Sequence, residues 1–285
     1  MKMARERQLE TGASRDTTDS TAQLHQGATP RRILTYHEVE PEKSTYIYAV
    51  TSQQLDQQLK LVAERNRRET DSTELTFDDG HISNYEIARP LLERHASKAL
   101  FFVTVSRVGT DAQTMNWEQL RALTSAGHSV QSHGWSHKFL IHCSPTQLRD
   151  ELSRSKAELE HRTGLPVLSI SVPGGRWNAP VLRAAADAGY QRVYTSECWR
   201  EPEVRQGVLV TGRLMIRTDM SLTQIEKWLA ADIPSLRKMR AKNFVKDAVR
   251  RVTGDRLYHQ LWCWLADSGP SGVDKESEQV SLHRT

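Results

Sequence analysis

Apolar runs of strand length alternate along this chain with amphipathic stretches of helix length. We predict strands at residues 32–36, 74–77, 99–103, 128–132, 167–172, 191–195 and 207–216. Apolar residues at helical spacing predict helices at 51–66, 82–94, 116–126, 144–163, 179–188 and 222–229. Strands that alternate with helices favour a parallel α/β sheet, and polar residues follow the carboxyl ends of several strands. The pattern therefore indicates an α/β barrel with a site at one mouth.

The two ends of the chain depart from this pattern. Residues 1–30 are polar and show no periodicity, so we expect a disordered leader before a catalytic domain at 31–233. Residues 234–285 form a basic tail, with eight lysines or arginines and two aspartates between 236 and 258. Apolar positions recur there at helical spacing. Residues 236–267 are thus predicted to lie on a membrane surface or to pack as helices on the barrel.

Composition narrows the classes of function. The 285 residues carry a net charge of +4, but the stretch 236–258 alone carries +6, which leaves the rest near neutral. A nucleic-acid-binding protein would spread its basic surface more widely, so nucleic acid is not expected as a partner. No secretory signal or membrane-spanning run is present in the sequence, and the three cysteines are widely separated. We expect a cytoplasmic protein, with the tail as a possible contact to the inner face of the membrane.

Two adjacent carboxylates, Asp78 and Asp79, follow the strand at 74–77 and precede Gly80. Neighbouring side chains on a strand point to opposite faces, but a turn at Gly80 would let both enter one cavity. Asp-Asp-Gly alone is an ordinary solvated turn. A pair of histidines further along the chain changes that interpretation.

His133 and His137 follow the strand at 128–132. In zinc proteases with this spacing, a glutamate follows the first histidine, whereas this chain has Gly134, so a protease is disfavoured. Asp79, His133 and His137 together predict a site for zinc or another divalent ion with open positions. Such an ion lowers the pKa of its bound water to about 7, and Asp78 is the predicted general base.

These motifs resemble the polysaccharide deacetylases of carbohydrate esterase family 4, the NodB-like group, over residues 32–220. The resemblance implies a deformed (β/α)7 barrel, here with a helical C-terminal extension. It also implies removal of acetyl groups from N-acetylated sugars. The substrate would be polymeric, or lipid-linked if the tail contacts the membrane.

A third motif of the family, Arg-x-Pro-x-Gly-x-x-Asn, matches residues 171–178 in part. Ser171 replaces the arginine that steadies the base in the family, so that role is either lost or taken by Arg176. The resemblance implies that Pro173, Gly174 and Gly175 line the substrate site, with the amide of Gly174 as oxyanion donor. A tight structural loop explains the same residues.

The general acid is expected at the start of the barrel. The family's late Leu-x-His motif is absent, because no histidine lies between His161 and His259. Tyr36-His37 resembles the first-strand motif of the poly-N-acetylglucosamine deacetylases, which makes His37 the predicted acid, a structural histidine being the alternative. Aromatic and acidic residues in nearby loops are candidates to line the sugar cleft: Tyr46, Tyr48, Glu197 and Trp199.

Three functions compete on this evidence. The leading interpretation is a metal-dependent N-deacetylase that acts on an N-acetylhexosamine unit during glycan or glycoconjugate assembly. A deformylase, an O-acetyl esterase or a purine-catabolic amidohydrolase would use the same metal ligands. A sugar-binding module with a degenerate site is the third, and the missing arginine favours it while the intact Asp and His residues do not.

Overall fold

The computed structural model describes residues 32–68, 73–198, 200–230, 234 and 241. The chain divides into two compact units, Met1–Leu229 and Ala230–Thr285. Almost all described residues belong to the first unit. The leader at 1–30 and the helical tail predicted at 236–267 lie outside the described residues, apart from the single position 241, so those two expectations stay predictions.

One curved sheet forms the centre of the first unit. Its strands lie in the order β11-β1-β4-β5-β6-β7-β8-β10-β9, and every neighbouring pair is parallel except β10 and β9. The bounds are β1 Ile33–Tyr36, β4 Glu74–Phe77, β5 Ala99–Val103, β6 Ser129–Ser132, β7 Ser169–Ser171, β8 Arg192–Thr195, β9 Glu203–Arg205, β10 Val208–Gly212 and β11 Leu214–Met215. The predicted α/β class is confirmed.

The last extended segment closes the ring. Strand β10 pairs with β8 through residues 209–212, and β11 pairs with β1 through residues 214 and 215. Only Arg213 separates β10 from β11. The predicted strand at 207–216 is therefore one bent strand that leaves β8 and joins β1, and seven parallel positions complete a deformed barrel.

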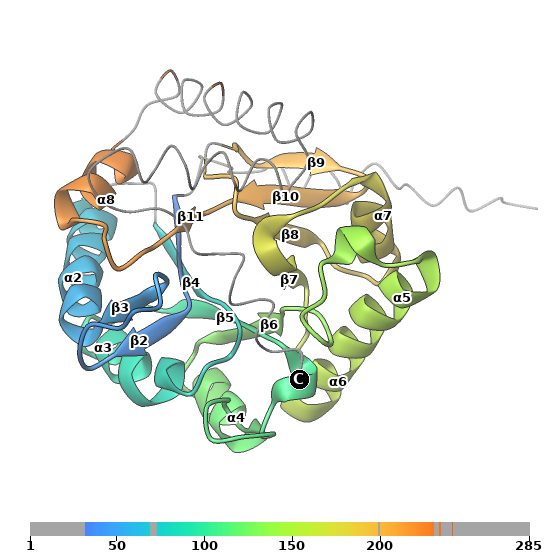
Figure 1. The fold of residues 1–285 in the computed structure, drawn as a ribbon, viewed down its shortest axis with the longest axis horizontal. Helices are drawn as coiled ribbons and strands as arrows, with labels where there is room; N and C mark the ends of the chain where they lie inside the picture. The colour runs from blue at the N-terminus through green and yellow to red at the C-terminus, as the bar shows by residue number, and fades with distance from the viewer. Residues whose placement is uncertain (1–31, 69–72, 199, 231–233, 235–240, 242–285) are drawn as a thin grey trace, which may run out of the picture. The chain divides into compact units, whose positions relative to one another are not determined.

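Helices surround this ring of strands (Figure 1). They are α2 Ser52–Arg68, α3 Arg89–Arg94, α4 Trp117–Ser125, α5 Pro145–Arg149, α6 Ser155–Thr163, α7 Ala179–Asp187 and α8 Leu222–Leu229, with short π or 3-10 turns η1 Asn84–Ala88, η2 Val105–Arg107, η3 Leu140–His142, η4 Asp150–Arg154 and η5 Pro173–Gly175. Side-chain caps fix the residues at which several of these helices begin. Asn116 and Ser144 each form a capping box with the glutamine three residues later, and the Asn178 side chain caps α7.

Some features were not predicted from the sequence. Strands β2 (Glu38–Glu40) and β3 (Ala49–Thr51) form a small parallel sheet directly after β1, and β9 adds an antiparallel edge. Each is only three residues long, which is too short for a periodic signal. The π turns η1 and η4 interrupt the helices predicted at 82–94 and 144–163.

The barrel interior is layered. Ile33, Phe102 and Tyr194 form a buried cluster with Leu100 against it. Because side chains alternate along a strand, the next inward residue of β1 is Thr35, whose hydroxyl lies 3.0 Å from that of Thr76 on β4. Toward the carboxyl ends of the strands, the aromatic layer is therefore followed by a layer of polar side chains.

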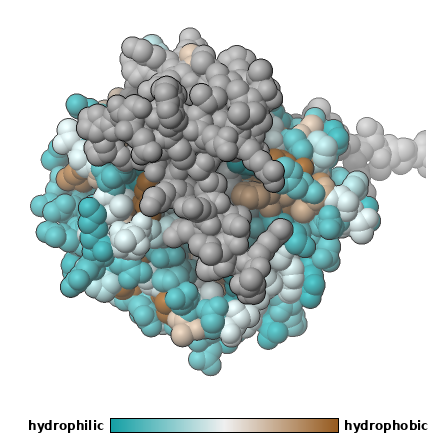
Figure 2. Space-filling model, in the orientation of Figure 1, coloured by the Kyte–Doolittle hydropathy of each residue, from teal (hydrophilic) through white to brown (hydrophobic). Residues whose placement is uncertain are grey.

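The surface has no large apolar feature among the described residues. Only Leu165, Leu168 and Leu222 are exposed large apolar side chains there. On the face in Figure 2, most described residues are hydrophilic. Within the described ranges, no helix is both long and apolar enough to span a bilayer.

Candidate active site

A left-handed turn after β4 brings both aspartates to the mouth of the barrel. Asp79 has φ 72° and Gly80 has φ 83°. Two consecutive residues in this region reverse the chain, and a Cβ on Gly80 would lie only 3.1 Å from Cγ1 of Val103. Asp78 is 2% exposed and the Asp79 side chain 30% exposed. The turn therefore cancels the strand alternation that would otherwise separate the two carboxylates.

Asp79, His133 and His137 converge in the geometry of a metal site. Nε2 of His133 lies 3.3 Å and Nε2 of His137 lies 3.1 Å from Oδ1 of Asp79. Tetrahedral zinc with bonds near 2.1 Å keeps its ligand atoms about 3.4 Å apart, so the spacing fits. Oδ1 of Asp79 is buried, and among the described residues no group forms a hydrogen bond to it. These residues could hold a divalent ion with positions left open.

A hydrogen bond fixes the orientation of His133. Its Nδ1 lies 2.7 Å from the carbonyl oxygen of Ser171, which can only accept. Nδ1 therefore carries a proton, and Nε2, which faces Oδ1 of Asp79, is the nitrogen left to bind an ion. Metal-binding histidines are oriented in this way by a second hydrogen bond.

Arg213 holds the Asp78 carboxylate from inside the barrel. Its guanidinium donates from NH1 to Oδ1 at 2.9 Å and from NH2 to Oδ2 at 2.8 Å, while the Ser171 hydroxyl donates to Oδ2 at 2.9 Å. Arg213 also donates to Thr76 Oγ1, and it lies over the ring of Phe102. The Arg213 side chain is 1% exposed and that of Asp78 is 3% exposed.

This network keeps Asp78 ionised. Burial alone raises the pKa of the Asp78 carboxyl, but the charges of Arg213 and His133 and the hydrogen bonds from Arg213 outweigh burial and hold that pKa below its usual range. An ionised carboxylate beside the metal ligands can accept a proton. Its assignment as general base stays a prediction.

The structure corrects the alternatives for the missing family arginine. The role is not lost, and Arg176 does not supply it, because the Arg176 guanidinium lies 5.2 Å from the ring centre of Phe139 and no bond joins it to Asp78. Arg213 occupies that place, and Ser171 contributes a hydroxyl. A sequence signal was available: Arg213 is the only charged residue in the apolar strand 207–216. Spacing could not reveal its partner, which lies 135 positions away.

His37 follows the end of β1, near Asp78 and Asp79. It is 9% exposed, and its ring centre lies 5.1 Å from that of Tyr48, which contacts Tyr46 at 5.8 Å. Burial lowers the pKa of His37, and the charges of Asp79 and Asp78 act in the opposite direction, which places the imidazole near both carboxylates. Its role as general acid stays a prediction.

The loop after β7 packs closely against neighbouring side chains at Gly174 and Gly175. Gly174 and Gly175 have φ 64° and 65°, and Pro173 is buried. A Cβ on Gly174 would clash with the ring of Phe139, and one on Gly175 would clash with Ser196. Only glycine fits these two positions. The oxyanion role of the Gly174 amide stays a prediction.

The structure gives different results for the other residues that were predicted to line the sugar cleft. Glu197 accepts a hydrogen bond from Nε1 of Trp177 at 3.1 Å and pairs with Arg200, so its carboxylate is already engaged. Trp199 lies outside the described residues. Tyr48 lies beside His37, and Tyr46 contacts Tyr48.

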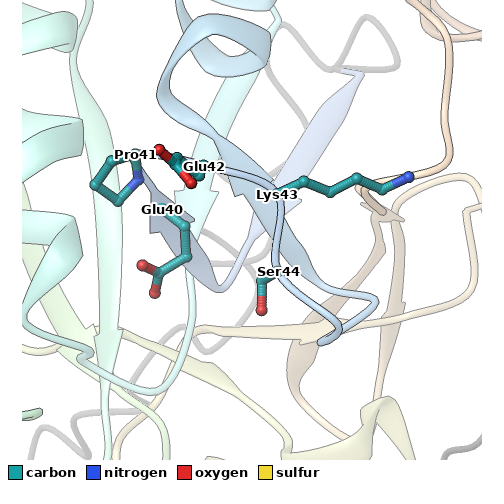
Figure 3. A pocket seen from close by; sticks show the side chains of 5 residues that line it. All are labelled: Glu40, Pro41, Glu42, Lys43 and Ser44. Carbon is teal, nitrogen blue, oxygen red and sulfur yellow. The ribbon is translucent and has the colours of Figure 1, made fainter.

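A second polar region borders the small sheet β2-β3. Glu38, Glu40 and His81 offer three potential ligand atoms within 4.8 Å of one another, and each residue is half-buried. A cavity of about 420 Å³ is lined by Glu40, Pro41, Glu42, Lys43 and Ser44 (Figure 3). None of the predicted site residues lines this cavity. It therefore adds nothing to the assignment of the centre.

Comparisons with known proteins identify relatives of this chain. A family model described as polysaccharide deacetylase matches residues 65–193. A chitooligosaccharide deacetylase from a Bradyrhizobium species is 30% identical over 145 residues, which are 47% of this chain and 62% of that protein. A peptidoglycan-N-acetylglucosamine deacetylase from Bacillus cereus is 29% identical over 123 residues, which are 43% of this chain and 55% of that protein. The match thus spans little more than half of each relative.

Solved structures show the same fold. The Streptococcus pyogenes deacetylase PplD, solved in complex with acetate, superposes with a TM-score of 0.63 and 24% identity, covering 70% of this chain and 97% of that one. Over residues 65–193, where the candidate Asp-His-His centre lies, the chain matches the polysaccharide deacetylase family.

Proposed function

We propose that this protein is a metal-dependent N-deacetylase that acts on an N-acetylhexosamine unit of a polysaccharide or glycoconjugate, with zinc as the preferred ion. One observation carries the proposal: three potential metal ligands converge beside an ionised aspartate that a buried arginine holds in place. A degenerate sugar-binding module would have no reason to keep a buried Asp78–Arg213 pair directed at that centre.

The residues take complementary roles in amide hydrolysis. A bound divalent ion supplies Lewis acidity, which polarises the acetyl carbonyl and acidifies water. Asp78 accepts the proton of the attacking water, and Arg213 keeps the carboxylate ionised and oriented. The Gly174 amide donates to the developing oxyanion, and His37 protonates the departing nitrogen. All these groups follow carboxyl ends of parallel strands, where barrel enzymes place their chemistry.

The aromatic pair Tyr46–Tyr48 supports a sugar substrate. Aromatic faces suit pyranose rings, and Tyr48 lies against the His37 ring. Relatives named for chitooligosaccharide and peptidoglycan deacetylation make such polymers the first substrates to test. Other acyl groups, in a formamide or an O-acetyl ester, would meet the same ligands and are the second candidates.

Acetate release tests the proposal. Zinc-reconstituted protein is incubated with N-acetylated chitooligosaccharides, peptidoglycan, O-acetylated xylan and lipid-linked N-acetylglucosamine, and Asp78→Asn is the control. We expect acetate from at least one N-acetylated donor and a loss of at least about 100-fold in the variant. Sugar binding without acetate release from any donor would instead support a binding module.

A cytoplasmic location with a peripheral membrane contact is also part of the proposal. It depends on the basic tail, which lies outside the described residues apart from position 241. Flotation with anionic liposomes, using the full chain and a chain that ends at residue 233, tests it. Equal recovery of the two proteins in the liposome fraction would exclude the contact.

A further inference from the structure

The loop that carries both histidine ligands has an unusual backbone. His133 follows β6, and His137 has φ 61°, a left-handed conformation that a side chain with a Cβ adopts only at a cost. Gly134 is also left-handed, with φ 79°. A strained backbone of this kind persists only where surrounding contacts hold it.

A π turn in the neighbouring helix supplies that support. Turn η4, Asp150–Arg154, separates α5 from α6. Such turns are rare and often lie at functional sites. Two side chains of this turn, Glu151 and Arg154, contact the loop, and Ser155, which follows the turn, contacts Ser132 just before the loop.

Glu151 makes the central contacts. Its Oε2 accepts from the backbone amides of Trp135 at 3.0 Å and Ser136 at 2.8 Å, and its Oε1 accepts from the Ser136 hydroxyl. These amides lie between the two histidine ligands. The carboxylate is nearly fully buried, at 3% exposure for the residue, and Lys138 lies 3.9 Å from Oε1.

Two further contacts support the loop beside those of Glu151. The Arg154 guanidinium lies 3.6 Å from the ring centre of Trp135. Ser132 donates its hydroxyl to Ser155 at 3.0 Å and accepts from the Gly134 amide at 3.1 Å. The loop is therefore held at both its beginning and its middle by one bulged helix segment.

We propose that Glu151 is a positioning residue that sets the metal affinity of the centre by holding the loop from His133 to His137 in its ligating conformation. The inference rests on the proposed metal centre. Glu151 does not contact the ligand atoms, and it acts through the backbone between them. Removal of its carboxylate leaves two partly buried amides without their acceptor, so the loop shifts to satisfy them and His137 leaves its place.

The zinc dissociation constant of purified full-length protein, from competition with a chromophoric chelator, tests this role. We expect Glu151→Met, which keeps the volume and removes both acceptors, to weaken zinc binding about 10- to 100-fold, as loss of an outer-shell partner does. Glu151→Gln keeps one carbonyl acceptor for the two amides, and Ser136 can reverse its hydroxyl, so we expect a loss of no more than about threefold.

Gln131→Met is the matched control. The Gln131 side chain, at 7% exposure for the residue, accepts from two backbone amides, those of Leu168 at 3.0 Å and Ser169 at 2.8 Å. Neither amide lies in the metal loop. Gln131→Met should lower the thermal midpoint as Glu151→Met does, while zinc affinity stays within about twofold of wild type.

The zinc affinities of these variants decide the role of Glu151. A zinc affinity of Glu151→Met within threefold of wild type, or no weaker than that of Gln131→Met, overturns the role of Glu151. If Glu151→Met does not fold, Glu151→Asp, which withdraws the carboxylate by one methylene, replaces it with an expected loss of about tenfold, and unchanged affinity there also overturns the role. A wild-type protein that binds no divalent ion would defeat the proposed centre itself, and this inference with it.

Discussion

Replacement of Arg213 by Met should destabilise the barrel far more than the loss of one surface charge would. The substitution keeps an unbranched side chain of similar length and removes the guanidinium that pairs with both oxygens of Asp78. It leaves a buried carboxylate with the Ser171 hydroxyl as its remaining donor in this network. An unpaired buried charge is one of the few single changes that costs several kcal/mol.

The structure sets the size of the effect. Breaking a buried ion pair by removal of one partner costs about 3–5 kcal/mol, whereas an exposed pair contributes about 0.2–1 kcal/mol. Here both side chains are at most 3% exposed, so the larger figure applies. Domains of this kind are stable by about 5–15 kcal/mol, so Arg213→Met should remove a large share of the total.

Urea unfolding followed by tryptophan fluorescence measures this change, with the midpoint and slope giving the free energy of unfolding. Arg217→Met is the matched control, because Arg217 pairs with Asp219 through two bonds of 3.0 and 3.1 Å, but the side chains are 37% and 53% exposed. We expect less than about 1 kcal/mol there. Asp78→Asn in the Arg213→Met background should recover part of the loss, because no buried charge then remains unpaired.

The stability lost in Arg213→Met should also depend on pH. Because the pKa of Asp78 in the folded protein lies below its usual range, the pair stabilises the fold above the ordinary carboxyl pKa and loses this contribution as the pH falls. The difference between wild type and Arg213→Met should therefore be full at pH 7 and narrow in acid. A loss below about 1 kcal/mol at pH 7, or a difference that does not depend on pH, would refute the account of Asp78 and Arg213.

Three further outcomes are expected. Burial, followed by the charge of Lys98, lowers the pKa of His128 to about 4. His128 should therefore reduce wild-type stability by at most about 3 kcal/mol as the pH falls from 6.5 to 4. Unfolding measured across this pH range should lack that dependence in His128→Gln, and wild-type and variant stabilities that fall in parallel would contradict it. Gly174→Ala should reduce kcat and stability more than Gly164→Ala, because both have positive φ but only the first clashes with another side chain; equal effects on both measures would exclude the close approach. His37→Gln should lower kcat about 10²- to 10⁴-fold while zinc affinity stays unchanged, and a kcat near that of wild type would remove His37 as the acid.

The barrel could be predicted because extended runs recur between amphipathic helices, and runs such as Ala99–Val103 and Val208–Gly212 are strongly apolar. Each of the seven predicted strands corresponds to one position in the ring, and the helices between them begin near their capping residues. The short strands β2, β3 and β9 could not be predicted, since three residues carry no period. Closure of the barrel depends on hydrogen bonding between strands far apart in the chain. The hydrophobic periodicity of each strand carries no information about which strand it pairs with.

The candidate site divides in the same way. Asp79, His133 and His137 stand in short motifs, so their residue types and the strands before them were enough to predict that they converge. Arg213 and Glu151 are held by tertiary contacts 135 and 15 or 16 positions from their partners, and neither belongs to a motif that the sequence displays. The substitution of Ser171 for arginine was visible, but its compensation by Arg213 required the bend between β10 and β11.

Crystals of the protein soaked in zinc, with diffraction measured on both sides of the zinc absorption edge, test the central claim most directly. The account predicts one strong anomalous peak within about 2.0–2.2 Å of Nε2 of His133, Nε2 of His137 and a carboxylate oxygen of Asp79. The peak should vanish in His137→Ala crystals. A peak elsewhere in the molecule, with none at these three residues, would contradict the metal centre on which the proposed deacetylase activity depends.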